Sequence, residues 1–292
     1  MAEVTNKTAP AVNLTDELFS TKQSSSCHLS VQAGLDGFSF CILDTKTNKF
    51  LVLQHFPFNG IATFNRLSEK IAGIISESEL LKNNFKSVSC SVVHAKSTLV
   101  PNALFDENQK NDFLSFNFTL DADEEVRANN LRNLDAKNLF AVNLNLENTL
   151  KKFFPNVQFI HHSTSLLEST MGTFKNQPGK KMVVHVGRSQ FEIAIAEGKQ
   201  LLFYNSFRHQ SSEDFIYYVL FVCEQLQLNP EKVDLILLGE IERSSALYEI
   251  LHKYVRHIHF GERSENFEYA YKLETIPKHF YHNLFSQYLC VS

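Results

Sequence analysis

The chain has 292 residues, of which 43% are hydrophobic and 21% are charged, and its formal net charge is −4. This balance is typical of a globular protein, and the length accommodates one large or two medium-sized domains. Lys and Arg form no run and the net charge is acidic, so we expect no nucleic-acid partner.

No segment is continuously apolar over about 18 residues, the length that spans a membrane. The first residues also lack a basic start followed by an apolar stretch, which a secretory signal requires. We therefore expect a cytoplasmic protein without membrane insertion. The cysteines have no paired spacing, which excludes a disulfide framework and a CxxC metal knuckle; they are Cys27, Cys41, Cys90, Cys223 and Cys290.

Residues 1–25 are mostly polar, with a small apolar patch at Leu14, Leu18 and Phe19. This composition predicts a partly disordered N-terminal tail.

Residues 28–58, "HLSVQAGLDGFSFCILDTKTNKFLVLQHFPF", have the pattern of three consecutive strands. Asp36-Gly37 marks the first turn and the polar run from Asp44 to Asn48 marks the second. A helical pattern of apolar residues follows from Phe64 to Leu81, and an apolar strand follows at 88–93.

The middle of the chain, residues 95–180, is less regular. Its patterns predict a turn at "LVPNALF", strands at 136–144 and 157–162, a short helix at 147–154 and a capped helix at 163–172. The segment from Phe105 to Phe118 places four Phe residues beside a polar run. Phe113 and Phe116 would share a helix face, so burial against the first domain is the simpler interpretation and a partner surface is the alternative.

Residues 183–207, "VVHVGRSQFEIAIAEGKQLLFYNSF", repeat the three-strand pattern. Gly187 follows Gly34 by 153 residues (187 − 34), and the same offset pairs the apolar positions of the first two strands; after a gap, Lys49 pairs with Lys199 and Leu51 with Leu201. A helical pattern at 215–226 and an apolar strand at 233–238 complete the second unit. The repeated order β-β-β-α-β predicts two related domains, domain I at 26–175 and domain II at 176–292. We expect the closing helix at 277–289 to return toward domain I.

Duplicated halves that each open with a glycine-ended hairpin resemble the actin-like, ribonuclease H-like α/β fold, with two domains around a cleft. More narrowly, "LSVQAGLDGFSFCILD", "LVPNALF" and the 183–207 run resemble domain-of-unknown-function 3822, a bacterial family without a settled activity. The fold is shared with ATPases, with sugar kinases and with platform proteins of pilus and secretion machines, which bind partner proteins.

The resemblance implies where a nucleotide would lie. In active members, an Asp-X-Gly in each hairpin positions hydrated Mg²⁺; Gln32-Ala33-Gly34 and His185-Val186-Gly187 stand there in this chain. Mg²⁺ prefers carboxylate oxygen, so both replacements disfavour the metal. A pair of glycines is the third motif, and Gly239-Glu240 occupies its place.

These positions define a degenerate nucleotide cleft without a catalytic residue or a metal. Asp36 is the nearest carboxylate that could compensate for Gln32. Arg188, with the backbone N–H groups of its turn, could hold an anion without a metal, although a solvated turn residue is the simpler interpretation. The candidate cleft residues are Gly34, Asp36, Gly187, Arg188, Ser189 and Gly239.

Histidines outside the hairpins predict no metal site. His161 and His162 are adjacent on a predicted strand, so their side chains would point to opposite faces and would not share a metal. A structural role is the simpler interpretation.

The sequence thus favours a non-catalytic scaffold or adaptor that binds an unidentified protein partner and uses no cofactor, with Mg-ATP disfavoured. The alternative is a residual ATP-binding protein, an ATPase-like or kinase-like enzyme. Gln32 and His185 are the residues that separate the two interpretations.

Overall fold

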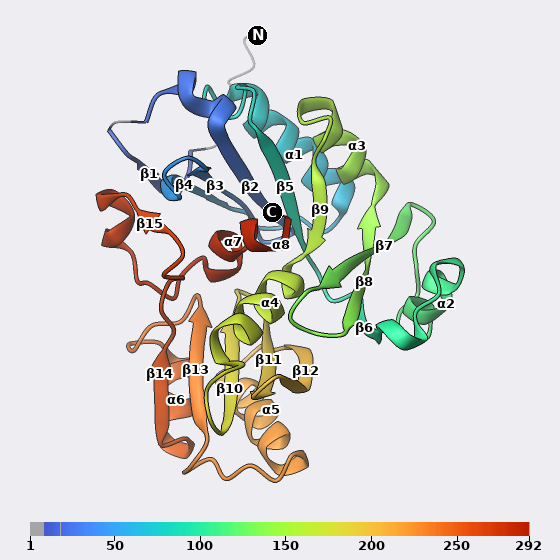
Figure 1. The fold of residues 1–292 in the computed structure, drawn as a ribbon, viewed down its shortest axis with the longest axis vertical. Coiled ribbons are helices and arrows are strands. Elements are labelled where there is room, and N and C mark those ends of the chain that lie inside the picture. Colours follow the sequence, from blue (N-terminus) through green and yellow to red (C-terminus); the bar gives the residue numbers. More distant parts are fainter. Residues whose placement is uncertain (1–8, 18, 292) are drawn as a thin grey trace.

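The computed structural model describes residues 9–17 and 19–291 and contains two α/β domains, with a small third sheet beside the first (Figure 1). The first domain fills the upper half of Figure 1 and the second domain the lower half. Within this described part, no helix is both long enough and apolar enough to cross a membrane.

The first sheet has seven strands in the order β1-β4-β3-β2-β5-β9, and β15 pairs with β4. Both faces of this sheet are covered, so its central strands are almost wholly buried and apolar. The strands are β1 (Val12–Thr15), β2 (Cys27–Gly34), β3 (Gly37–Asp44), β4 (Lys49–Pro57), β5 (Ser87–Val93), β9 (Gln158–His161) and β15 (Glu268–Tyr269).

Two helices cover one face of the first sheet: α1 (Phe64–Glu77) and α3 (Leu144–Phe153). Each begins at a side-chain cap that satisfies backbone N–H groups of the first turn. Thr63 accepts from the N–H of Arg66 before α1, and Asn143 accepts from the first turn of α3.

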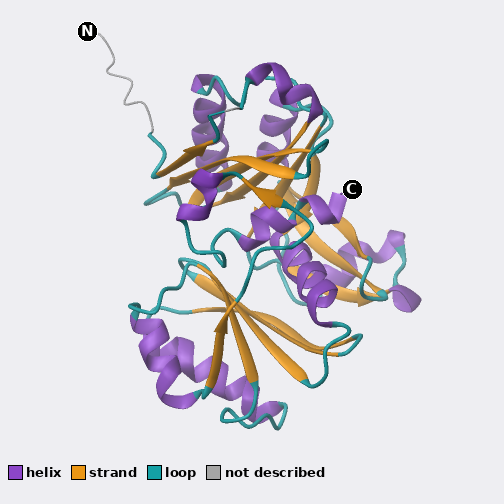
Figure 2. Ribbon diagram, turned by 60° about the vertical axis from the view of Figure 1, so that its left-hand side comes forward, coloured by secondary structure: helices purple, strands orange, loops and turns teal. Residues whose placement is uncertain are grey.

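The second sheet has five strands in the order β12-β11-β10-β13-β14. They are β10 (Lys180–Val186), β11 (Gln190–Glu197), β12 (Gln200–Arg208), β13 (Asp234–Gly239) and β14 (His257–Phe260). Helices α5 (Ser212–Gln225) and α6 (Ala246–Tyr254) pack on one side of this sheet (Figure 2). Helix α4 (His162–Phe174) packs Leu166 and Leu167 on the other side, between the two domains.

The two domains share one topology, as the sequence repeat predicts. The order β4-β3-β2-β5-β9 in the first sheet matches β12-β11-β10-β13-β14 in the second. The antiparallel register also shifts at equivalent places, between Ile42 and Leu43 and between Ile195 and Ala196. The offset of 153 residues relates Ile42 to Ile195, so a local irregularity of the backbone repeats with the sequence.

The third sheet projects from the first domain and has the order β6-β8-β7. Its strands are β6 (Ser97–Pro101), β7 (Glu124–Leu131) and β8 (Ala136–Asn143), with short 3₁₀ helices at Asn102–Leu104 and Glu107–Gln109 and helix α2 (Lys110–Ser115). Leu114 of α2 is buried on this sheet, whereas Phe116 is 90% exposed. Burial of Phe116 against the first domain, the simpler interpretation of the sequence, is therefore wrong.

The C-terminal segment returns to the first sheet and covers its second face. It contains a 3₁₀ helix at Tyr271–Thr275 and two short helices, α7 (His282–Ser286) and α8 (Tyr288–Val291), in place of the single helix predicted for 277–289. Phe285 of α7 is 3% exposed and packs edge-on against Phe50 of β4 at 4.8 Å between ring centroids. Five buried residues of this segment pack in the core around β3 and β4 of the first domain; they are Phe267, Ala270, Leu273, Leu284 and Phe285.

The N-terminal segment also differs in part from the predicted tail. Val12–Thr15 form β1, which pairs antiparallel with β4, and Thr21–Ser26 form a 3₁₀ helix. Residues 1–8 and Leu18, which the sequence assigns to the same tail, lie outside the described residues.

Replacing Phe285 with Ala should lower the free energy of unfolding by about 3–5 kcal/mol, because a buried ring is lost and a cavity remains. Chemical denaturation monitored by circular dichroism measures this. Tyr271→Ala is the matched control, since Tyr271 belongs to the same segment but is 86% exposed, and it should change the value by less than about 0.5 kcal/mol. Equal effects of the two variants would contradict the packing of α7 on the first sheet.

Candidate functional site

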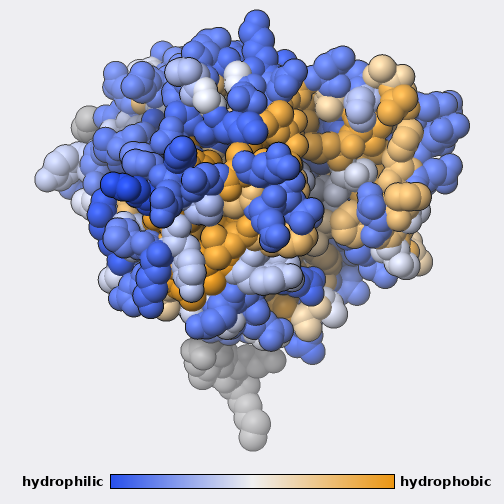
Figure 3. Space-filling view, turned by 90° about the horizontal axis from the view of Figure 1, so that it is seen from below, coloured by the Kyte–Doolittle hydropathy of each residue, from blue (hydrophilic) through white to orange (hydrophobic). Residues whose placement is uncertain are grey.

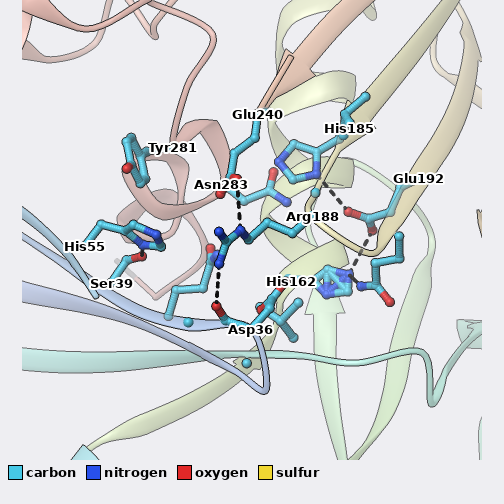
Figure 4. A pocket seen from close by; sticks show the side chains of 18 residues that line it. Asp36, Ser39, His55, His162, His185, Arg188, Glu192, Glu240, Tyr281 and Asn283 are labelled. Carbon is cyan, nitrogen blue, oxygen red and sulfur yellow. Dashed lines mark hydrogen bonds and ion pairs between the residues drawn. The ribbon is translucent and has the colours of Figure 1, made fainter. Parts of the chain in front are cut away.

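A polar cavity lies between the two domains, where the two glycine-ended hairpins approach each other (Figure 4). The end of β13 and the segment that enters α7 complete its wall. The cavity measures about 70 Å³. A buried water needs about 10–15 Å³, so this volume holds a few waters, whereas pockets for drug-sized ligands measure about 300–1,000 Å³.

The structure brings together five of the six residues that the sequence predicts for the cleft. The cavity is lined by Gly34, Asp36, Gly187, Arg188 and Gly239. Ser189 is exposed at the tip of its turn and does not line the cavity. Gln32 and His185, the replacements for the metal-positioning Asp residues, also face the cavity.

Arg188 connects the two hairpins across the cleft. Its guanidinium donates to the backbone oxygen of Asp36 at 3.3 Å and lies 4.0 Å from the carboxylate of Glu240 (Figure 4). Arg188 therefore touches the first hairpin and the third motif at the same time. In this arrangement the side chain occupies the space between the motifs and is not a free turn residue.

Gly239 is held against strand β10. Its φ is +84°, and a Cβ built on it would lie 2.1 Å from the backbone oxygen of Val186. Its N–H donates to the oxygen of His279, and the N–H of Glu240 donates to the oxygen of Val186 at 2.7 Å. Only glycine fits this close approach, so the backbone contact with Val186 requires glycine at the first position of the third motif.

The C-terminal segment closes the cleft from the side of the first sheet. Tyr281 and Asn283 line the cavity, and Tyr281 adopts a left-handed conformation with φ of +55° just before α7. His279 accepts from Gly239 through its backbone oxygen, and its ring bonds to the oxygen of Ile241 at 2.7 Å. Residues 279–283 therefore fill part of the space beside the third motif.

A buried carboxylate, Glu192 of β11, lies at the back of the cleft. Its oxygens are 3.2 Å from His162 Nε2 and 3.2 Å from His185 Nδ1, and the hydroxyl of Tyr204 donates to it at 2.6 Å. The side chain is only 2% exposed. Glu192 stands directly opposite His185 in the β10–β11 register. The second hairpin therefore carries a carboxylate on β11, one strand away from the position on β10 where the resemblance places an Asp.

The sequence analysis missed Glu192, although a signal was present. Glu192 interrupts the apolar run of β11 between Phe191 and Ile193, where a hairpin register pairs it with His185. His162 was placed on a strand with a structural role. The structure instead puts it at the start of α4, where Nε2 approaches Glu192 and Nδ1 has no hydrogen-bond partner among the described residues.

The electrostatics of this cluster favour a charged Glu192. Burial by itself raises the pKa of the carboxyl, but His162, His185 and Tyr204 outweigh burial and lower the pKa to about 2. Burial lowers the pKa of His162 itself. At neutral pH we therefore assign the main stabilisation of the carboxylate to the hydrogen bonds from His185 and Tyr204.

The equivalent place in the first domain is uncharged. The offset of 153 residues relates Glu192 to Ser39, and Ser39 stands opposite Gln32 in its own hairpin. The hydroxyl of Ser39 is 2.8 Å from His55 Nδ1, and burial lowers the pKa of His55. The two halves of the cleft thus carry different polar pairs on the same backbone positions.

The cleft does not fit a magnesium ion with ATP. Within the described residues, no group of three or more His, Cys, Asp or Glu side chains is placed to hold a metal ion. Glu192 is the buried acid of the cleft, and both of its oxygens already have protein partners. The small cavity also leaves no room for a nucleotide in this arrangement.

Comparison with known proteins assigns the family. A family model described as a protein of unknown function, DUF3822, matches residues 16–258. The chain belongs to the DUF3822 family. The resemblance drawn from the sequence is thereby confirmed. No curated protein matches the chain.

Two solved structures are similar to this DUF3822 protein over most of its length. One is a Bacteroides thetaiotaomicron VPI-5482 protein with an actin-like ATPase fold and unknown function, at 26% identity and a TM-score of 0.77, covering 84% of this chain and 94% of the other. The other belongs to a PilM–PilN type IV pilus biogenesis complex, at 12% identity and a TM-score of 0.57, covering 91% and 98% of the two chains. These likenesses confirm the predicted actin-like fold.

Gly239→Ala should lower the free energy of unfolding by about 3 kcal/mol or more, because the methyl group meets a backbone oxygen and the residue keeps a positive φ. Gly179→Ala is the matched control. Gly179 has a similar φ of +77° but open space around it, so only the backbone cost of about 1–2 kcal/mol should appear. Equal losses in thermal or urea unfolding would show that the contact with Val186 is unimportant.

The depressed pKa of Glu192 predicts a loss of stability in acid. A lowered pKa in the folded state adds stability above the unfolded value of 4.5, and this contribution disappears as the pH falls toward about 2. We expect this carboxyl to account for up to about 3 kcal/mol between these limits.

Urea unfolding between pH 7 and pH 2 measures the contribution of Glu192. Glu192→Gln should flatten that part of the pH profile and lower stability at neutral pH. Glu197→Gln, at the exposed end of the same strand, should leave the profile unchanged. If Glu192→Gln still loses the same stability between pH 4.5 and pH 2, other carboxyl groups are responsible for that loss.

Proposed function

We propose that this protein is a non-catalytic scaffold or adaptor, in which the actin-like cleft no longer uses Mg-ATP and the fold serves to bind a partner protein. The closed cleft carries the proposal. Arg188 bridges the hairpin of the first domain and Glu240 of the second, across the position where the three motifs meet.

Two polar clusters of the cleft support this proposal, because their members already bond to one another. Glu192 is surrounded by two histidines and a tyrosine hydroxyl, and Ser39 is bonded to His55. A site that binds Mg²⁺ needs carboxylate oxygens that face water or phosphate. Here Gln32 and His185 face the cavity instead.

Space gives a second, independent support. The cavity of about 70 Å³ is several times smaller than an ordinary ligand pocket. A nucleotide would have to displace Arg188 and the residues around Tyr281. The domains would have to separate before binding, and the contacts across the cleft oppose that separation.

A role in protein binding is supported by the fold. The matched chain of the PilM–PilN type IV pilus biogenesis complex has this architecture and is found in a complex with another protein. We therefore propose a protein partner for this chain as well. The alternative, a residual ATP-binding enzyme, would have to rely on Asp36, a carboxylate that lines the cavity beside the first hairpin.

The purified protein should release no phosphate above background over several hours at millimolar Mg-ATP, because Gln32 and His185 stand where the two metal-positioning carboxylates are expected. Thermal unfolding should also be the same with ATP alone and with Mg-ATP. A ligand present at 100 times its Kd would add about 2.7 kcal/mol to stability, which this measurement detects readily.

Asp36→Asn is the control for that experiment. Phosphate release that is present in the natural protein and lost in Asp36→Asn would overturn the scaffold proposal and favour the enzyme. Release that is unchanged in Asp36→Asn would point to a contaminating activity and would leave the protein itself inactive.

A further inference from the structure

We infer that a groove between β6 and α2 binds an extended peptide segment of a partner protein, with apolar side chains at alternating positions and at least one Lys or Arg. This β6–α2 groove is lined by Thr98, Leu99, Pro101, Asp112, Phe113 and Phe116, among others. Its volume is about 410 Å³, within the range of ordinary ligand pockets. The groove is separate from the interdomain cleft, and the inference rests on the proposed function only in requiring a protein partner.

One wall of the groove is an unpaired strand edge. In the third sheet β6 pairs with β8 alone, and no described strand pairs with its other edge. Such an edge presents free backbone N–H and C=O groups, which an extended peptide can pair with as an added strand.

The ladder between β6 and β8 shows which backbone groups are free. The N–H of Ala141 donates to Lys96, and the N–H of Asn102 donates to Asp135, so even-numbered residues of this strand direct their backbone groups toward β8. By alternation, Ser97, Leu99 and Pro101 direct theirs outward. Ser97 uses its N–H locally and Pro101 has none, so Leu99 offers the one outward pair of N–H and C=O.

The other wall of the groove exposes large apolar side chains. Phe116 is 90% exposed and Leu104 is 66% exposed, beside the half-buried Phe113. Figure 3 shows hydrophobic side chains gathered on the right of the molecule, the side on which Figure 1 places α2 and β6. Folding of this chain leaves these side chains in water, which is typical of a surface that a partner covers.

Charge around the groove selects a basic partner. Between Phe105 and Phe116 the chain has three acidic residues and one basic residue, Lys110, which pairs with Glu107 at 2.8 Å. Asp112 lines the groove and has no ion pair among the residues that the structure describes. A Lys or Arg of the bound segment would supply the missing positive charge.

A library of random ten-residue peptides displayed on phage, selected on the full chain, tests the inference. Enriched peptides should alternate apolar and other residues and contain Lys or Arg. Synthetic copies should bind at least about tenfold more weakly to Phe116→Asp than to the natural protein, because Phe116 is the most exposed apolar contact. Copies with N-methylated backbones should also bind more weakly, since they lose the hydrogen bonds to β6.

Tyr271→Asp is the matched control, because Tyr271 is about as exposed as Phe116 but does not line the groove. This variant should leave peptide binding unchanged. Asp112→Asn should weaken basic peptides about threefold to fivefold and make binding less sensitive to salt. Failure to enrich such peptides, or binding that is indifferent to Phe116→Asp, would overturn the inference. Self-association of the natural protein that Phe116→Asp abolishes would overturn it too, by assigning the groove to a second copy.

The two proposals fail in different experiments. Phosphate release by the cleft would contradict the non-catalytic scaffold, whereas loss of peptide binding would contradict only the groove.

Discussion

The arrangement of the two domains depends on one buried carboxylate. Glu192 is almost wholly removed from water, and a charge in that place is tolerated only with close hydrogen-bonding partners. Those partners come from different elements: His185 from β10, Tyr204 from β12 and His162 from the start of α4. Helix α4 lies between the domains and also contacts α7, so the polar cluster fixes the helix on which both domains rest.

The same constraint explains why the cleft is closed. The carboxylate stands on the cross-strand neighbour of the position where the resemblance places an Asp, and there it approaches His162 at the start of α4. His185 then faces the cavity, and Arg188 reaches across to Asp36 and Glu240. The charges that a nucleotide site would direct at a metal are thus directed at other protein groups. The backbone of the cleft is retained while its polar side chains hold the protein together.

Much of this fold could be predicted because it repeats. The apolar spacing of the first two strands of each unit matches at one offset, and even the register shift after Ile42 recurs after Ile195. The contributions from distant segments could not be predicted in the same way. Strand β1 and the residues around Phe285 have little periodicity of their own, and their place is set by burial against β4. Glu192 was missed for a related reason: the hairpin places His185 beside it, but the approach of His162 from the start of α4 depends on tertiary packing.

The contrast between the cleft and the β6–α2 groove indicates where recognition takes place. In the cleft, glycine at 239 and the bridge made by Arg188 leave about 70 Å³, and the buried acid there is satisfied internally. In the described part of the chain, no strand pairs with the outer edge of β6 and no basic side chain forms an ion pair with Asp112. Phe116 beside them is exposed to water. Burial of exposed apolar area drives association, and an unpaired strand edge fixes the orientation of the bound segment. The duplicated fold therefore provides the support, and the binding that we infer lies in the small sheet inserted into the first domain between β5 and β9.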